Sequence, residues 1–258
     1  MAGSDRIIDD RIFDGFSRIS LEDMGKVKLM NRVDTKFVAN IRQLKALLQR
    51  MESEYYIQDI ENQLNMPYYT RYFDTAELDM FYQHQRGKKV RQKIRLRLYE
   101  GSMDLPFLEV KSKNNKGRTS KKRILMEDGE NLAFYDEFLD KHAFYPFTVL
   151  LPAIENHFYR MTLVNRDMTE RVTIDTELSF HNPLTRLDKE FPDLCIVEWK
   201  KDGRVLNSFL ERNLRDLHIH QMGFSKYCIG VATTTELLRL NRLKQKLRMV
   251  DKIRKGLR

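Results

Sequence analysis

The chain contains little cysteine, glycine or proline: two, 11 and six residues of 258. Cys195 and Cys228 form neither a CxxC pair nor a zinc-type spacing, so we expect buried, reduced side chains in a reducing compartment rather than a disulfide. Hydrophobic residues make up 41% of the chain. The sequence can therefore form a sizeable core and does not belong to the disordered class.

Long apolar runs and familiar phosphate-binding loops are also missing. No stretch approaches the ~20 apolar residues that a spanning helix needs, and residues 1–20 lack the apolar run of a signal peptide. These absences predict a cytoplasmic protein, whose association with a membrane would need a separate partner. Neither G-x-x-x-x-G-K-[ST] nor G-x-G-x-x-G occurs, and the six histidines show no metal-ligand spacing.

Positive charge is present in excess. The chain has 46 lysines and arginines against 37 acidic residues, a formal net charge of +9. Such an excess indicates an anionic partner: nucleic acid, an anionic membrane surface, or a phosphorylated small molecule.

The distribution of periodic segments indicates one domain over residues 1–258, with a core at about 25–232 and a basic C-terminal helix at 233–258. No repeat or Pro/Gly/Ser-rich linker divides the chain. Helical spacing predicts helices at 41–51, 132–139 and 206–217. Alternation predicts strands at 31–39, 68–74, 90–99, 107–112, 120–126, 157–163, 171–176, 195–200 and 227–231. Many strands and few helices indicate an α+β fold with a mostly antiparallel sheet.

Charged residues gather on one face of several of these strands. In the segment 90–99, Arg91, Lys93, Arg95 and Arg97 share a face, because side chains alternate along a strand. One such strand alone would be an ordinary solvent-exposed strand, but the pattern recurs in 32–36, 107–111, 171–175 and 196–200. Cations side by side repel one another and need anions to balance them. A closed β tunnel of about eight strands, charged inside and flanked by helices outside, meets this need.

Eight short motifs then occur in one order: Arg-Val-Asp-Thr-Lys-Phe (32–37), Tyr-Phe-Asp-Thr (72–75), Lys-Ile-Arg-Leu-Arg-Leu-Tyr (93–99), Phe-Leu-Glu-Val-Lys (107–111), Tyr-Arg (159–160), Arg-Val-Thr-Ile-Asp-Thr (171–176), Val-Glu-Trp-Lys (197–200) and Ser-Lys-Tyr-Cys (225–228). In this the chain resembles the catalytic domain of the vacuolar transporter chaperone (VTC) family. That family is the polyphosphate polymerase branch of the triphosphate tunnel metalloenzyme (CYTH-like) superfamily. The resemblance implies a tunnel that binds triphosphate or polyphosphate and transfers a phosphoryl group.

The resemblance also implies roles for individual residues. Arg95 and Arg97 would bind phosphate oxygens bidentately and, with Lys111, Lys200 and Glu198, would form the catalytic set. Further phosphate-binding positions would be Lys36, Arg160, Arg171, Ser225 and Lys226. Ser120 and Lys122 resemble a Ser-x-Lys strand of the family, although Lys121 and Arg123 leave the register open. The alternative for each cation is a solvated surface position.

A divalent metal, Mn²⁺ or Mg²⁺, is the implied cofactor, because hard cations prefer carboxylate oxygens. Glu198 is the first candidate ligand. Glu109 is either a second ligand or the partner of a neighbouring arginine, and Asp34 is a weaker candidate. Asp175 is expected to support a turn or to pair with Arg171.

The segment at 32–36 bears on the reaction. Tunnel triphosphatases of the superfamily carry Glu-x-Glu-x-Lys there, whereas this chain has Arg32-x-Asp34-x-Lys36. The difference favours transfer of the γ-phosphate of ATP to polyphosphate over hydrolysis. Tripolyphosphate hydrolysis and simple polyphosphate binding stay open as alternatives. We do not expect nucleic acid as a partner, because the strand faces lack interleaved aromatics and a closed tunnel excludes duplexes.

Overall fold

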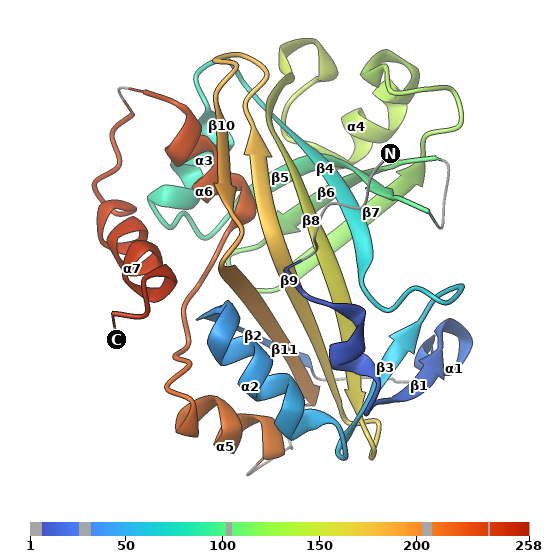
Figure 1. Ribbon diagram of the computed structural model, residues 1–258. Coiled ribbons are helices and arrows are strands. Elements are labelled where there is room, and N and C mark those ends of the chain that lie inside the picture. The colour runs from blue at the N-terminus through green and yellow to red at the C-terminus, as the bar shows by residue number, and fades with distance from the viewer. Residues whose placement is uncertain (1–6, 26–31, 102–104, 203–207, 237, 258) are drawn as a thin grey trace.

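Eight antiparallel strands form the main path of an 11-stranded sheet (Figure 1). The computed structural model describes residues 7–25, 32–101, 105–202, 208–236 and 238–257. The path runs in the order β2 (Arg32–Asn40), β11 (Leu194–Asp202), β9 (Glu170–His181), β8 (Leu151–Asn165), β4 (Met66–Asp74), β5 (Arg91–Tyr99), β6 (Phe107–Lys113) and β7 (Thr119–Leu125). Beside it, β1 (Ser17–Ser20) pairs with β3 (Tyr55–Asp59), β3 pairs with β8, and β10 (Asp188–Phe191) pairs with β9.

Seven α-helices lie within the described ranges: α1 (Leu21–Gly25), α2 (Ile41–Met51), α3 (Asp79–Gln85), α4 (Asp136–His142), α5 (Phe209–Asp216), α6 (Lys226–Thr234) and α7 (Lys244–Arg254). Three 3₁₀ turns accompany them: η1 (Asp10–Phe13), η2 (Leu132–Tyr135) and η3 (Phe147–Val149). The α+β class and the mostly antiparallel sheet are confirmed.

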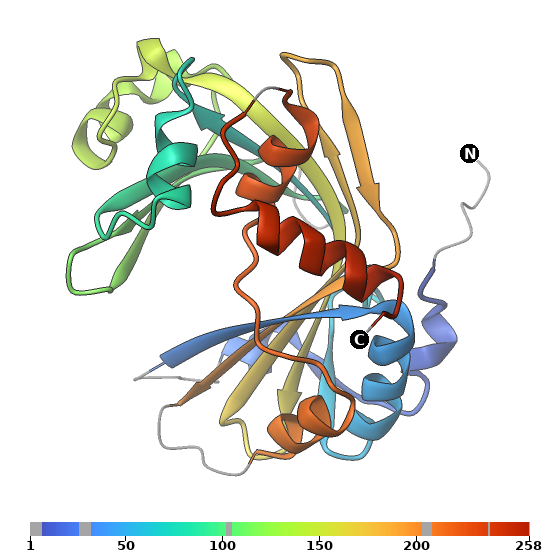
Figure 2. The ribbon, with the colours of Figure 1, turned by 90° about the vertical axis from the view of Figure 1, so that its left-hand side faces the viewer.

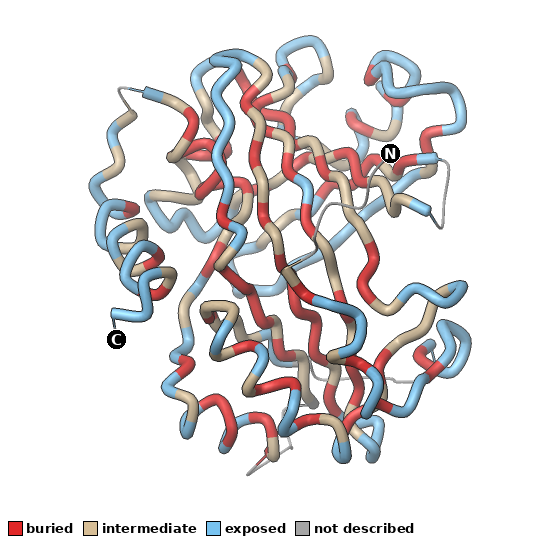
Figure 3. The backbone as a smooth tube through the Cα atoms, in the orientation of Figure 1, coloured by how far each residue is buried: buried red, intermediate tan, exposed pale blue. Residues whose placement is uncertain are grey.

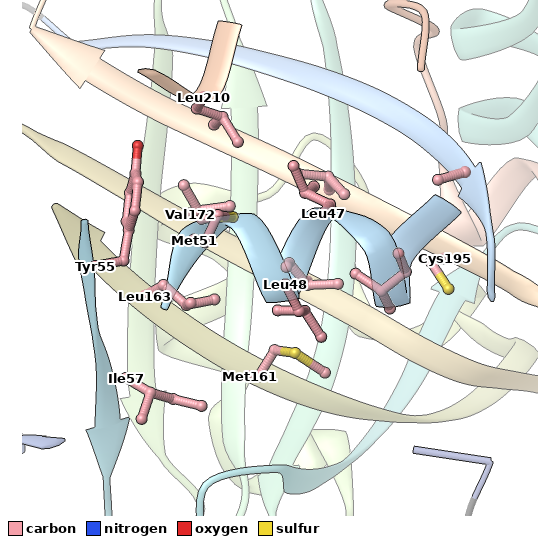
Figure 4. Packing of buried hydrophobic residues seen from close by; sticks show 14 of the residues in the cluster. Leu47, Leu48, Met51, Tyr55, Ile57, Met161, Leu163, Val172, Cys195 and Leu210 are labelled. Atoms are coloured by element: carbon pink, nitrogen blue, oxygen red, sulfur yellow. The ribbon is translucent and has the colours of Figure 1, made fainter. Parts of the chain in front are cut away.

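Helix α2 forms where the sequence predicts it and covers the convex face of the sheet. Asn40 caps it, because its side chain accepts a hydrogen bond from the Gln43 amide while the Gln43 side chain accepts one from the Asn40 amide. The apolar side of α2 is fully buried and packs with α5 on β8, β9 and β11 (Figure 4). The residues on that side are Leu44, Leu47, Leu48 and Met51.

The convex face of β5 and β6 is covered separately, by η2 and α4. Ile94, Leu96 and Val110 pack there against Leu132 and Leu139. Buried residues concentrate on the strands and on the helix sides that face them (Figure 3). Because alternate residues of the strands are apolar and face these helices, the intervening charged residues point to the concave face. This arrangement is the one that the sequence predicts.

The sheet is strongly curved but does not close (Figure 2). In the described chain, the end strands β2 and β7 do not pair with each other, so the prediction of a closed tunnel is not confirmed. The free edge of β2 is partly occupied, since Phe37 bridges to Gln221 and the Met222 amide donates to the Lys36 carbonyl at 2.9 Å. Strand β7 is exposed along most of its length and carries lysines and arginine, which discourage pairing at an edge.

Two predictions in the C-terminal third are wrong. Residues 227–231 are not a strand but the buried core of α6. They carry no helical pattern because nearly every residue is buried, and the Ser225 side chain caps the helix by accepting from the Cys228 amide. The basic tail is not one helix over 233–258, since α6 ends at Thr234, where Thr235 is extended, and α7 covers only Lys244–Arg254.

Both cysteines are buried and free, as predicted. Gly230 allows α6 to lie against the sheet, because a Cβ at this position would be 2.6 Å from a ring carbon of Phe180. Within the residues described, no helix has both the length and the apolar character needed to cross a membrane.

Candidate functional site

The concave face of the sheet encloses a cavity of about 510 Å³, within the range of roughly 300–1,000 Å³ that is usual for small-ligand sites. It is called the groove below. Its cationic lining residues are Lys36, Lys93, Arg95, Arg97, Lys111, Lys121, Arg160, Lys200 and Lys226. Its other lining residues are Asp34, Tyr72, Thr119, Ile196, Glu198, Phe224 and Ser225. Both end strands, β2 and β7, contribute to this lining, so the curve of the sheet brings its two edges to one site.

On the β5–β6–β7 wall, Glu109 holds two cations in place. Its carboxylate lies 2.6 Å from Arg95 Nη2 and 3.0 Å from Lys121 Nζ. The Glu109 side chain is fully buried. Burial raises its pKa, but Arg95, Arg97 and Lys121 outweigh this effect and lower the pKa to about 2.

Arg97, another lining residue of the groove, has no ion pair within the described chain. Its side chain is buried, its Nε finds no hydrogen-bond partner, and its Cζ lies 5.7 Å from the centre of the Tyr68 ring. Burial, and then the charges of Arg95 and Arg160, lower its pKa. A buried, unpaired guanidinium costs free energy unless an anion accompanies it.

The floor of the groove is organised by Asp175. Arg160, opposite it on β8, donates to both carboxylate oxygens, from Nε at 2.6 Å and from Nη2 at 2.8 Å. Lys226 Nζ, from the first turn of α6, donates to the same carboxylate. The expectation that Asp175 pairs with Arg171 is therefore wrong, because Arg160 and not Arg171 is its cross-strand neighbour.

Helix α6 is held at the groove by two further contacts. The buried Tyr227 hydroxyl donates to Asp74, whose carboxylate also accepts from the Met80 and Phe81 amides at the start of α3. Ser225 accepts from Lys93 Nζ at 2.9 Å. These contacts place Ser225 and Lys226 at the cavity wall.

On the β2–β11 wall, Glu198 lies between two lysines. Its carboxylate is 2.6 Å from Lys36 Nζ and 3.6 Å from Lys200 Nζ, and its side chain keeps 18% of its exposure. Lys200 also donates to Thr173 Oγ1 at 3.3 Å. Burial raises the pKa of Glu198, but Lys200 and Lys36 outweigh burial and hold the pKa well below its usual range.

Three carboxylates thus pair with six of the nine cations, two each, and the described residues supply no ion pair for Lys93, Arg97 or Lys111. This excess of positive charge changes the proton affinity of the lining. Burial is the largest effect that lowers the pKa of Lys200 and of Lys226, in each case to about 8. Burial raises the pKa of Tyr72, but Arg95, Arg97 and Lys93 outweigh it and lower the pKa to about 8.

We expect tripolyphosphate binding to weaken between about pH 7 and about pH 9, because the two lysines lose their charge in the free protein over this range. A bound polyanion raises their pKa, so binding at about pH 9 takes up about one to two protons. Calorimetry in buffers of different ionisation enthalpy measures this uptake. The double variant Lys200→Arg/Lys226→Arg stays charged, and equal uptake by the variant and the native protein would contradict the assignment. Tyr72, whose pKa is also about 8, adds proton uptake of the same sign in the native protein and in the double variant.

The sequence model of the VTC domain family matches residues 31–235 of this chain. The chain belongs to this family. The match spans every strand of the main path and ends just after α6, so it includes all the lining residues of the groove. The resemblance read from the eight motifs is thereby confirmed.

Comparison with solved structures finds similarity at low sequence identity. A putative adenylate cyclase from Bacillus halodurans is 12% identical, with 76% of this chain and 96% of that chain covered and a TM-score of 0.48. A putative adenylyl cyclase from Hippeastrum, with a dominant triphosphatase activity, is 15% identical, with 81% and 98% covered and a TM-score of 0.48. No curated protein matches the chain significantly.

Most of the predicted site residues of the VTC domain do line the groove: Lys36, Arg95, Arg97, Lys111, Arg160, Glu198, Lys200, Ser225 and Lys226. Two of the predicted phosphate-binding residues do not. Lys122 lies opposite Val110, which packs on the convex face, so the register places Lys121 in the groove instead. Arg171 shares the concave face but donates from Nη2 to the Met24 carbonyl at 2.8 Å, at the end that α1 covers.

Sequence reasoning missed Lys121 and Tyr72 as lining residues. It placed Lys93 on the charged strand face with Arg95 and Arg97 but assigned it no role. Lys121 could not have been found, because four consecutive polar residues, 120–123, allow either register. Tyr72 belongs to a recognised motif, but only the sheet order shows that it lies directly opposite Arg95.

Of the three candidate metal ligands of the VTC domain, Glu198 and the weaker candidate Asp34 line the groove, and Glu109 does not. Among the described residues, no three His, Cys, Asp or Glu side chains gather as a metal cage. Glu109 does not fit, because it is fully buried and both of its oxygens accept from cations. Glu198 fits, because it is accessible in the groove, and Mg²⁺ commonly takes one or two carboxylates together with substrate phosphates.

Proposed function

We propose that this VTC domain transfers the γ-phosphate of ATP to the end of a growing polyphosphate chain in the groove, with Mn²⁺ or Mg²⁺ as cofactor. The observation that carries the proposal is the lining itself, where nine lysines and arginines face two carboxylates. Membership of the VTC domain family supports chemistry on polyphosphate or triphosphate.

The reaction asks the protein mainly for positioning and charge stabilisation. An oxygen of the terminal phosphate of the chain attacks the γ-phosphorus of ATP, the bond from that phosphorus to the β–γ bridging oxygen breaks, and ADP leaves with the electron pair. Arg95 and Arg160 are held in place by Glu109 and Asp175, so they can bind phosphate oxygens without first being ordered. Arg97 has no such partner, so an incoming phosphate would be its counterion.

Glu198 would hold the divalent cation, which when bound neutralises charge on the phosphates and polarises them. Lys36 and Lys200 flank Glu198 and would contact the same phosphates from either side. On the concave face of β2, Asp34 and Lys36 line the groove, so this strand offers one described carboxylate there. Tunnel triphosphatases carry two carboxylates at the corresponding segment, which supports transfer over hydrolysis.

The decisive experiment incubates the purified protein with ATP and Mn²⁺ or Mg²⁺. We expect a ladder on a gel stained for polyphosphate, together with ADP and little free phosphate. Free phosphate without a ladder, above all from tripolyphosphate, would replace the proposal with a hydrolase. Binding of tripolyphosphate without turnover of either compound would leave a binding module.

The expectation that nucleic acid is not a partner stays a prediction. The structure supports neither of the two arguments given for it, the closed tunnel and the lack of aromatic residues beside the cations. The sheet is open, and aromatic rings do lie beside the groove arginines, with Arg97 and Arg160 5.7 and 5.1 Å from the Tyr68 ring centre. Competition tests it: we expect tripolyphosphate, and not duplex DNA, to displace a bound polyphosphate. A cytoplasmic location also stays a prediction, as does association with a membrane through a partner, which co-purification from membranes would detect.

A further inference from the structure

A second group of cations lies on the concave face just beyond the groove. Arg91 on β5 lies directly opposite Lys113 on β6, next to the pair Lys93–Lys111 of the groove. Thr119, the neighbour of Lys113 on β7, lines the groove, so the cavity extends to this row. Two successive cross-strand pairs of like charge destabilise a sheet. Folding alone gives no reason for them.

Helices α3 and α7 bring further groups to the same place. Burial, and then the charges of Lys93, Arg91, Lys246 and Lys113, lower the pKa of His84 on α3 to about 2. The buried His84 Nδ1 finds no hydrogen-bond partner among the residues that the structure describes. Helix α3 lies beside α6, and Lys246 Nζ of α7 approaches Gly223, just before α6 (Figure 2). Residues distant in sequence thus converge at one end of the groove.

Arg91, Lys113 and Lys246 are here called the mouth cluster. Each is partly exposed, and in the described chain none forms an ion pair with a carboxylate. Arg91 Nη1 donates to the Lys88 carbonyl at 2.5 Å. The cluster therefore presents positive charge to the solvent without compensation from the described protein.

We propose that the mouth cluster binds the part of a polyphosphate chain that extends out of the groove. The inference rests on the proposed function and adds to it the end at which the chain leaves. Continuity with the groove favours this occupant over a separate macromolecule, because the mouth cluster continues the same strand face as Lys93 and Lys111. A tripolyphosphate bound in the groove would not need the cluster, whereas a long chain would contact both.

The test compares two triple variants with the same change in net charge. Arg91→Gln/Lys113→Gln/Lys246→Gln removes the mouth cluster, and the control Arg42→Gln/Lys45→Gln/Arg212→Gln removes three exposed cations on α2 and α5, on the convex side. For the mouth variant we expect the Kd of tripolyphosphate to stay within about twofold of native, and the Kd of long-chain polyphosphate to rise about tenfold. The slope of log K against log salt for the long chain should fall by about two to three. The control should match the native protein.

Other outcomes separate this inference from the proposed function. If the native protein binds no tripolyphosphate, the proposed function itself fails. If it binds tripolyphosphate but the mouth variant loses no long-chain affinity, or the control loses as much, the mouth cluster is not the exit site. Loss of binding to anionic vesicles or duplex DNA, with polyphosphate affinity unchanged, would also overturn the inference. Circular dichroism and thermal unfolding confirm that both variants fold.

Discussion

Glu198→Gln is expected to lower metal-dependent turnover by at least about 100-fold while strengthening metal-free binding of tripolyphosphate. The carboxylate is the accessible candidate ligand for the cation, and an amide is a far weaker one. The same change removes the negative charge that lies between Lys36 and Lys200, so the groove of the variant repels a polyanion less than the native groove does. A residue that merely held its two lysines in place would lose binding and turnover together.

Asp34→Asn is the matched control, because it removes the other lining carboxylate of the groove. We expect it to reduce turnover far less than Glu198→Gln and to leave the optimum metal concentration nearly unchanged. Titration of turnover with Mn²⁺, and calorimetry of tripolyphosphate with and without metal, give the two readouts. Unchanged turnover in Glu198→Gln would refute the metal assignment.

Arg97→Met is expected to abolish turnover and to raise the free energy of unfolding, by about 1 kcal/mol, whereas Arg95→Met abolishes turnover and lowers it by about 3 kcal/mol. The difference follows from their partners. Among the described residues, buried Arg97 finds neither an ion pair nor a partner for its Nε, so its removal relieves an unfavourable charge. Arg95 is the closest partner of the fully buried Glu109, which would keep only Lys121.

Urea unfolding of both variants at one pH, without polyphosphate, measures the two changes, and the ATP reaction measures turnover. Added tripolyphosphate should stabilise the native protein more than Arg97→Met, since the anion supplies the missing counterion. Destabilisation of Arg97→Met to the same extent as Arg95→Met would show that Arg97 is a structural residue. The sequence alone does not distinguish the two arginines, and it predicts that substitution of either one by alanine changes the melting curve little.

The register of β7 illustrates what sequence reasoning could not reach. Residues 120–123 are all polar, so no alternation indicates which of Lys121 and Lys122 faces inward. Pairing with β6 decides it by placing Lys121 opposite Lys111 and Lys122 opposite Val110. Helix α6 is a similar case, because a segment buried on almost every side has no amphipathic period to read.

The sequence by itself determined the family, the α+β class, most of the strands and the face of each strand that carries charge. The class, the strands and their charged faces follow from local alternation along the chain, whereas the family, and the roles of Arg160, Ser225 and Lys226, follow from the resemblance carried by the eight motifs. The tertiary structure alone decided that Glu109 and Asp175 are counterions of Arg95 and Arg160 and that, within the described parts of the chain, the sheet stays open and Arg97 finds no counterion. Such partners are distant in sequence. Strand order and register bring them together, and the residue pattern of a single strand contains no information about either.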